Sequence, residues 1–388
     1  MTTSSPYSYH HKPVFLAFFF YAFGLGILFP RLGDLQLQLG LTEGILGLSL
    51  IGLPLGVQLA LLFSETILRH ITLRTVMIAG VAIISACFVG TSISDNPTQL
   101  FIWLFGAGLA VGVIEVAVNL EADRVEYGLG RRIMNRSHAF WSLGFVVSSI
   151  LGALAAQFMI PLFIHFAVFG AAALCLTALY FASYQQAPAR PVDAEEQADM
   201  PRLARPTKAI MLLVGVTLSA MLAEGSAIDW SVIFMRDIFA TPPLISGTAL
   251  VLATFFQFFT RYFADQFVDR WGPYIITRFC LIILLIGVLS VVFSPVWPVA
   301  LFGFACLGIG SSVIFPLAMS AAAQLTDRPA GVNVASLAQF SFVVFLLAPP
   351  LLGFVAEHAG IRYAYGLCLP LIVISFLCLP SLKQNRLS

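Results

Sequence analysis

The sequence predicts an all-α polytopic membrane protein with twelve transmembrane helices. Of its 388 residues, 59% are hydrophobic and 10% are charged, whereas a soluble domain carries about 25% charged residues. Twelve apolar stretches fill almost the whole chain, and a helix that crosses the hydrocarbon core of a bilayer needs about 20 apolar residues. Because backbone polar groups in lipid must be satisfied within the segment, runs of this length indicate membrane-spanning helices.

Short polar connections separate the predicted spans. We expect the spans at residues 14–32, 44–63, 75–94, 99–121, 134–159, 162–184, 208–234, 244–264, 273–294, 297–324, 332–356 and 360–380. Of the 20 Lys and Arg residues, 17 fall on one side of this arrangement, and only Arg31, Arg236 and Arg362 fall on the other. Since cytoplasmic loops are enriched in Lys and Arg, this asymmetry predicts that both termini lie in the cytoplasm.

The longest polar segment, residues 185–207, is rich in proline and acidic residues. We expect it to be a cytoplasmic linker between an N-terminal six-helix bundle, residues 1–184, and a C-terminal six-helix bundle, residues 208–388. The halves also show weak internal similarity, because 106–157 and 305–357 share a glycine-rich span, a short cytoplasmic loop and a further span. Pseudo-symmetric bundles of this kind are typical of transporters that bind their solute between the repeats.

A local motif supports this architecture. Residues 260–273 read TRYFADQFVDRWGP, which resembles the second-half copy of the G-x-x-x-D-R-x-G cytoplasmic loop signature of the major facilitator superfamily. The resemblance implies that Arg261, Asp265 and Arg270 belong to a gating loop. The corresponding first-half segment, residues 64–70, lacks the Gly and Asp of the signature.

Further stretches resemble one branch of that superfamily, the bacterial fucose-permease-like and rhizopine-permease-like transporters. They are residues 114–119 with 137–144, residues 223–230 and residues 348–353. In fucose permease, a fourth-span Glu in a similar Glu-x-x-x-Asn setting takes part in proton-coupled sugar uptake, and Glu115 and Asn119 match that setting. The Asp that fucose permease carries in its first span is absent from the first span here, so neither fucose nor the same proton pathway is implied.

Ionisable groups inside the spans are the strongest candidates for a binding site. A charge at mid-bilayer costs about 2.5–3.5 kcal/mol on translocon-based scales, so such residues face a cavity, find a partner or stay neutral. Glu115 and Asn119, four residues apart, share one helix face. Either Glu115 faces a central cavity and binds solute or a proton, or it makes an interhelical hydrogen bond. His138, with Asn135 before it and Ser142 after it, forms a polar stripe that either binds solute or bridges helices.

The seventh predicted span holds two acids. Glu224 lies about 24 Å along the helix from its start, and Asp229, five residues later, is rotated from it by about 140°. Both can face one cavity only if the helix bends, which Gly225 favours. Otherwise Asp229 caps the outer end or pairs with Arg236. The amides of Gln257 and Gln339 either line the cavity or join helices.

Several functional classes find no support in the sequence. The six cysteines are scattered singly and no metal-spaced cluster is present, so we expect neither a metal site nor disulfides. There is no glycine-rich phosphate loop, and we expect neither an enzyme nor a cofactor. The formal net charge of +1 does not suggest nucleic acid as a partner.

The sequence therefore predicts a monomeric secondary transporter in the lipid of a bacterial inner membrane, working by alternating access. We expect it to carry a small polar, carbohydrate-like solute, coupled to protons through Glu115 and Glu224. A hydrophobic cavity raises the pKa values of these carboxyls, so that they can take up and release protons near neutral pH. One alternative is a proton-driven exporter of amphipathic compounds, which would use the many aromatic residues. Another is a membrane sensor or scaffold that kept the fold without transporting.

Overall fold

The computed structural model describes residues 9–188 and 205–383, so most of the expected linker lies outside the described residues. Within these ranges the regular elements are helices, in agreement with the predicted all-α class. They are α1 (His11–Gly26), η1 (Phe29–Arg31), α2 (Leu32–Leu39), α3 (Glu43–Leu50), α4 (Gly52–Leu68), α5 (Leu73–Ser92), α6 (Pro97–Leu129), α7 (Met134–Gln157), α8 (Leu162–Phe181), α10 (Lys208–Phe239), α11 (Pro243–Val292), α12 (Trp297–Ser311), α13 (Ile314–Ala323), α14 (Ala330–Ala359), α15 (Ile361–Gly366), α16 (Cys368–Cys378) and η2 (Leu379–Leu382).

Eleven helical segments of the described chain are long and apolar enough to cross a membrane. The longest of them, α11, has 50 residues and contains a break at Gly272, where φ is 79° and ψ is 160°. This backbone conformation favours glycine, and Pro273, which follows, has no N–H to continue the hydrogen-bonding pattern. The two parts of α11 are therefore two crossings, and the twelve predicted spans are all accounted for.

The same helix corrects the predicted gating loop. The chain remains helical up to Gly272, so Arg261, Asp265 and Arg270 all lie in the first part of α11 and not in a loop. The connection between the two crossings is reduced to the Gly-Pro break. α10 is one continuous α-helix of 32 residues through Gly225, with no unwound turn there.

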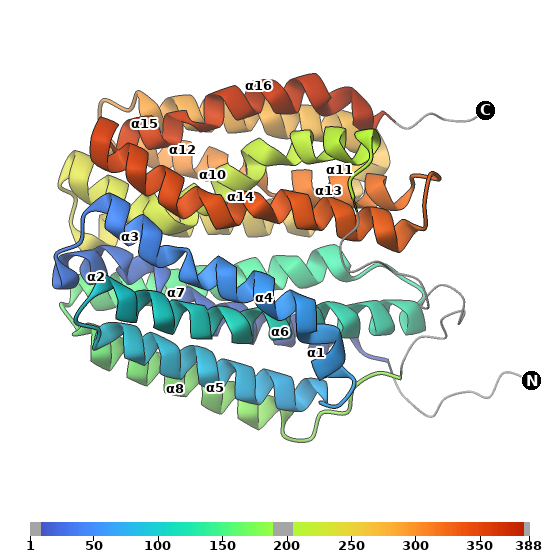
Figure 1. Cartoon of the computed structure of the whole chain (residues 1–388), viewed down its shortest axis with the longest axis horizontal. Helices are drawn as coiled ribbons and strands as arrows, with labels where there is room; N and C mark the ends of the chain where they lie inside the picture. The colour runs from blue at the N-terminus through green and yellow to red at the C-terminus, as the bar shows by residue number, and fades with distance from the viewer. Residues whose placement is uncertain (1–8, 189–204, 384–388) are drawn as a thin grey trace, which may run out of the picture.

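The helices lie side by side in two groups (Figure 1). Helices α1 to α8 form one group and α10 to α16 the other, which we call the N half and the C half. We call the end of the molecule that carries residues 69–72, 130–133 and 324–329 the basic end, since most Lys and Arg residues gather there. The opposite end is called the far end.

One contact between the halves, between α3 and α14, is made at the far end. A Cβ on Gly47 would lie 2.4 Å from the carbonyl oxygen of Pro349, and a Cβ on Gly353 would lie 2.4 Å from that of Glu43. Only glycine allows the two backbones to approach this closely. Beyond this contact the helices diverge, since α14 packs extensively on α3 and little on α4.

A second contact, between α7 and α11, runs the whole length of the molecule. At the far end the Leu244 N–H donates to Oε1 of Gln157, 3.1 Å away. At the basic end the side chain of Asn135 donates to Asp265, and the guanidinium of Arg136 lies 5.7 Å from the ring centroid of Tyr262. The halves thus meet at the far end on both sides, but at the basic end the described contacts between them are those of α7 with α11.

Candidate functional site

An ion pair between Arg261 and Glu224 lies midway along the C half. Nη2 of Arg261 is 3.2 Å from Oε1 of Glu224 and 3.4 Å from Oε2. Nε donates to the carbonyl oxygen of Ser312 at 3.0 Å, and Nη1 donates to Oγ of Ser142, in the N half, at 3.2 Å. The two charged side chains retain 13% and 14% of their accessible surface. Arg261 thus joins three parts of the C half to α7 of the N half.

Glu115 lies at the same depth as Arg261. Helix α6 begins at Pro97 and helix α11 begins at Pro243, both at the far end. Glu115 and Arg261 each lie 18 residues after the start of their helix. At a rise of about 1.5 Å per residue, each Cα is about 27 Å from the far end of its helix. The guanidinium is also close enough to act electrostatically on both Glu115 and His138. The structure therefore brings together an acid of the N half and an ion pair of the C half.

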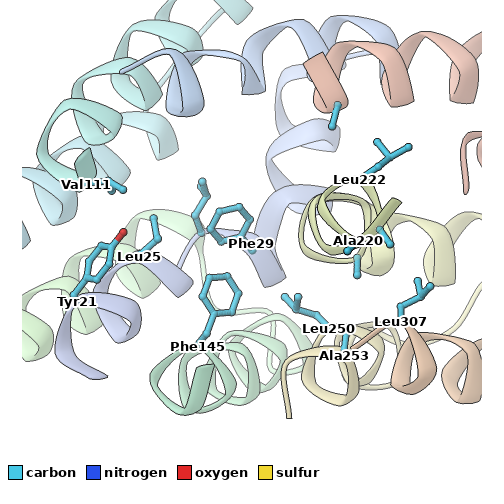
Figure 2. Packing of buried hydrophobic residues seen from close by; sticks show 14 of the residues in the cluster. Tyr21, Leu25, Phe29, Val111, Phe145, Ala220, Leu222, Leu250, Ala253 and Leu307 are labelled. Carbon is cyan, nitrogen blue, oxygen red and sulfur yellow. The ribbon is translucent and has the colours of Figure 1, made fainter. Parts of the chain in front are cut away.

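Neighbouring polar groups hold the carboxyl group of Glu115, and the residue as a whole is partly exposed. Nδ2 of Asn119 donates to Oε1 of Glu115 at 3.0 Å and to its carbonyl oxygen at 2.8 Å. The hydroxyl of Tyr21 lies within hydrogen-bonding reach of the same carboxyl, and Figure 2 shows it directed toward the helix that carries Val111. Glu115 is therefore hydrogen-bonded to its neighbours, as the second alternative expected, and the residue is partly exposed. Its binding of a solute or a proton stays a prediction.

Aromatic side chains line the N-half side of this site. The ring centroid of Tyr21 is 6.5 Å from that of Trp141, and Trp141 stacks on Phe145 at 5.2 Å. The ring centroids of Phe29, of the first crossing, and Phe145 are 5.2 Å apart. Figure 2 shows these two rings side by side. The ring of His138 meets Phe18 edge to face at 5.0 Å. An apolar wall therefore adjoins the polar groups.

Ser142 and Gln257 extend the polar cluster across the two halves. Gln257 is buried, and its Oε1 accepts a hydrogen bond from Oγ of Ser142 at 3.3 Å. Asn135, two turns from Ser142, is not part of this cluster, because it bonds Asp265 nearer the basic end. The predicted polar stripe on α7 is thus divided between the central site and the contact at the basic end.

The remaining predicted site residues lie elsewhere. Asp229 lies near Tyr365, close enough to act on it electrostatically. The Tyr365 hydroxyl donates a hydrogen bond to the carbonyl oxygen of Ser226 at 2.9 Å. Of the alternatives for Asp229, the pairing with Arg236 is not formed, since Arg236 bonds Asp237 at 2.6 Å and the carbonyl oxygen of Gly33 at 2.9 Å. Gln339 lies partly buried on α14. Arg270 stacks over Trp271 at 5.2 Å, beside the helix break.

Comparison with known proteins identifies the class of this protein. The sequence profile of the major facilitator superfamily matches residues 14–342 and 212–384. The chain therefore belongs to this superfamily, and it is a membrane transporter of that type.

Among its relatives is the uncharacterised transporter y4wD of Sinorhizobium fredii (strain NBRC 101917 / NGR234), 31% identical over 74% of both chains. An uncharacterised MFS-type transporter of Yersinia pestis is 26% identical over 93% of this chain and 92% of its own. The membrane protein MosC of Rhizobium meliloti is 23% identical over 40% of this chain and 38% of its own.

Solved structures share the fold at low sequence identity. A mutant of the nucleoside transporter NupG superposes with a TM-score of 0.78 at 11% identity, covering 96% of this chain and all of that one. The E. coli fucose:proton symporter FucP superposes with a TM-score of 0.63 at 17% identity, covering 96% of this chain and 98% of that one. At these sequence identities the likenesses show the fold alone.

Proposed function

We propose that the protein moves a small polar solute across a bacterial inner membrane together with protons. One observation carries the proposal: Glu115 is partly accessible at the same depth as the Arg261–Glu224 pair of the opposite half. An acid in that position can bind a proton or solute from whichever side is open. The solute would lie between the halves, with the amides of Asn119 and Gln257 beside it.

The arrangement of contacts suggests which side is open. The α3–α14 contact is confined to the far end, and α4 diverges from α14 toward the basic end. The basic end is the cytoplasmic side by the distribution of Lys and Arg. We infer that this conformation is closed to the outside and opens toward the cytoplasm.

The chemistry of the site favours a polar solute over an amphipathic one. An exporter of amphipathic compounds would be supported by a lining of mainly aromatic residues and methionines. Aromatic rings are present in both halves, around Trp141 in the N half and at Phe342 and Phe345 in the C half. The ion pair of Arg261 with Glu224 and the Ser142–Gln257 hydrogen bond lie between them, and these polar groups support a polar solute. The fucose:proton symporter, a structural neighbour, couples a sugar to protons, which agrees with the proposal.

Proton movement driven by solute in proteoliposomes tests the proposal. The full chain is reconstituted with a pH-sensitive dye inside, and hexoses, polyols and the corresponding sugar acids are added outside. At least one solute should acidify the lumen in the wild type, and Glu115→Gln should abolish acidification while solute exchange persists. Asp95→Asn, which alters an exposed carboxylate at the far end, is the control. Absence of proton movement with every solute, or coupling that survives Glu115→Gln, refutes it.

A further inference from the structure

We propose that Arg261 binds a carboxylate of the transported solute, so that the substrate class is small hydroxylated carboxylic acids. This inference rests on the proposed transport function and specifies the solute. Its starting point is the cost of placing a guanidinium inside the membrane, which is tolerated when the charge faces a cavity or finds a partner. Arg261 pairs with Glu224, and its side chain keeps 13% of its accessible surface.

The pairing with Glu224 is loose. Only Nη2 contacts the carboxylate, at 3.2 and 3.4 Å, whereas strong charge-assisted hydrogen bonds are about 2.7–2.9 Å long and arginine–carboxylate pairs are often bidentate. The other nitrogens bond two neutral oxygens, those of Ser312 and Ser142. The guanidinium is therefore held in position by neutral groups, and its anionic partner is replaceable.

Other acids near Arg261 are already engaged. Asp265, one turn away on the same helix, accepts a hydrogen bond from Asn135. Glu115 of the N half accepts one from Asn119 and acts on Arg261 only at longer range. A solute carboxylate that approaches the guanidinium therefore competes with Glu224 alone.

The opposite wall suits the remainder of such a solute. Glu115 offers acceptor oxygens, while Asn119 and the Tyr21 hydroxyl can donate or accept. Groups of this kind bind hydroxyls, since each can exchange hydrogen bonds with a hydroxyl that acts as donor and acceptor. A molecule with a carboxylate at one end and hydroxyls at the other would contact the C half through Arg261 and the N half through Glu115.

Matched pairs of probes test the inference. Thermal unfolding of the purified full chain is measured at pH 7 with D-gluconate against D-glucitol, D-glucuronate against D-glucose, D-galacturonate against D-galactose, and D-glycerate against glycerol. A ligand that binds the folded state raises Tm. At least one carboxylate should raise Tm, and its neutral counterpart should not.

Two variants separate this explanation from a structural role of the pair. Glu224→Gln removes the competing anion and should lower the Kd of that carboxylate about tenfold, whereas Asp265→Asn should leave it unchanged. The double variant Arg261→Gln with Glu224→Gln removes both charges together, so it is expected to fold, and it should lose the carboxylate response.

Three results would overturn the inference. They are binding of the neutral counterpart as tightly as the acid, carboxylate binding that survives the double variant, and no response to any of the eight probes. Proton movement driven by a neutral sugar would reject the carboxylate and leave the proposed function intact. A carboxylate that binds through Arg261 but drives no proton movement would instead reject the coupling.

Discussion

Gly47 of α3 and Gly353 of α14 meet backbone to backbone, so that a Cβ on Gly353 would lie 3.1 Å from the Cα of Gly47 and 2.4 Å from the carbonyl oxygen of Glu43. This contact joins the two halves at the far end. A side chain at either glycine requires the backbones to separate. It would therefore raise the free energy of the conformation in which the far end is closed.

Gly353→Ala should therefore shift the protein toward a far-end-open conformation and slow transport. Spin labels at Leu37 and Phe293, both exposed at the far end and on opposite halves, report the separation. We expect the distance distribution to broaden toward longer values. Gly366→Ala is the control, because no atom lies within 4 Å of its added Cβ. An unchanged distribution in Gly353→Ala would contradict the assignment of this contact as the far-end closure.

Arg261 and Glu224 should each depend on the other for stability. Removing one partner of a largely buried ion pair leaves an uncompensated charge, at a cost of about 3 kcal/mol. Arg261→Gln should lower Tm, and adding Glu224→Gln should recover part of the loss, which a double-mutant cycle measures. Arg270→Gln, at an exposed position, should change Tm little. Strictly additive effects would show that the two side chains do not interact.

Glu121 should hold the chain that follows α8 against α6. This buried carboxylate accepts hydrogen bonds from the Tyr184 hydroxyl at 2.6 Å and the Ala187 N–H at 2.7 Å. Tyr184→Phe should lower the free energy of unfolding by about 1–3 kcal/mol, since a buried acceptor loses a donor. It should also speed proteolytic cleavage within residues 182–188. Tyr180→Phe, at a position with an exposed side chain, serves as the control, and equal effects of the two variants would contradict the role of Glu121.

Asp327, in the connection between α13 and α14, should give stability that depends on pH. The Asn333 amide, 2.9 Å away, holds the pKa of Asp327 below its usual value. A group whose pKa is lower in the folded state contributes stability above its unfolded pKa, which is about 3.9 for Asp. This contribution is lost as the pH falls through the folded pKa. The difference in Tm between wild type and Asp327→Ala should therefore be largest near pH 7 and shrink below about pH 4. A difference that grows on acidification would have the wrong sign.

Hydropathy and charge were sufficient to predict the architecture, because lipid imposes length and apolarity on every crossing. The twelve spans were predicted correctly, and Glu115 and Glu224 were singled out as acids within the spans from the cost of a charge in the membrane. What the sequence did not reveal was the partner of Glu224. Arg261 is separated from it by 37 residues and lies on another helix, and no helical periodicity links the two.

The motif at 260–273 predicts a loop around Arg261, whereas the helix continues to Gly272. A usable signal was present, since Arg261 lies as far from the start of its helix as Glu115 does from its own. Asp229 illustrates the opposite error: Arg236 is near it in sequence, but its side chain extends to Gly33 and Gln36 of the N half.

The end-to-end contact between α7 and α11 has a mechanical consequence. Hydrogen bonds or close packing join these two helices at Gln157, Ser142 and Asn135, that is, at the far end, the middle and the basic end. The α3–α14 contact has no such continuation along α4. The halves can therefore separate on the side of α4 and α14 toward the basic end while the α7–α11 contact stays in place.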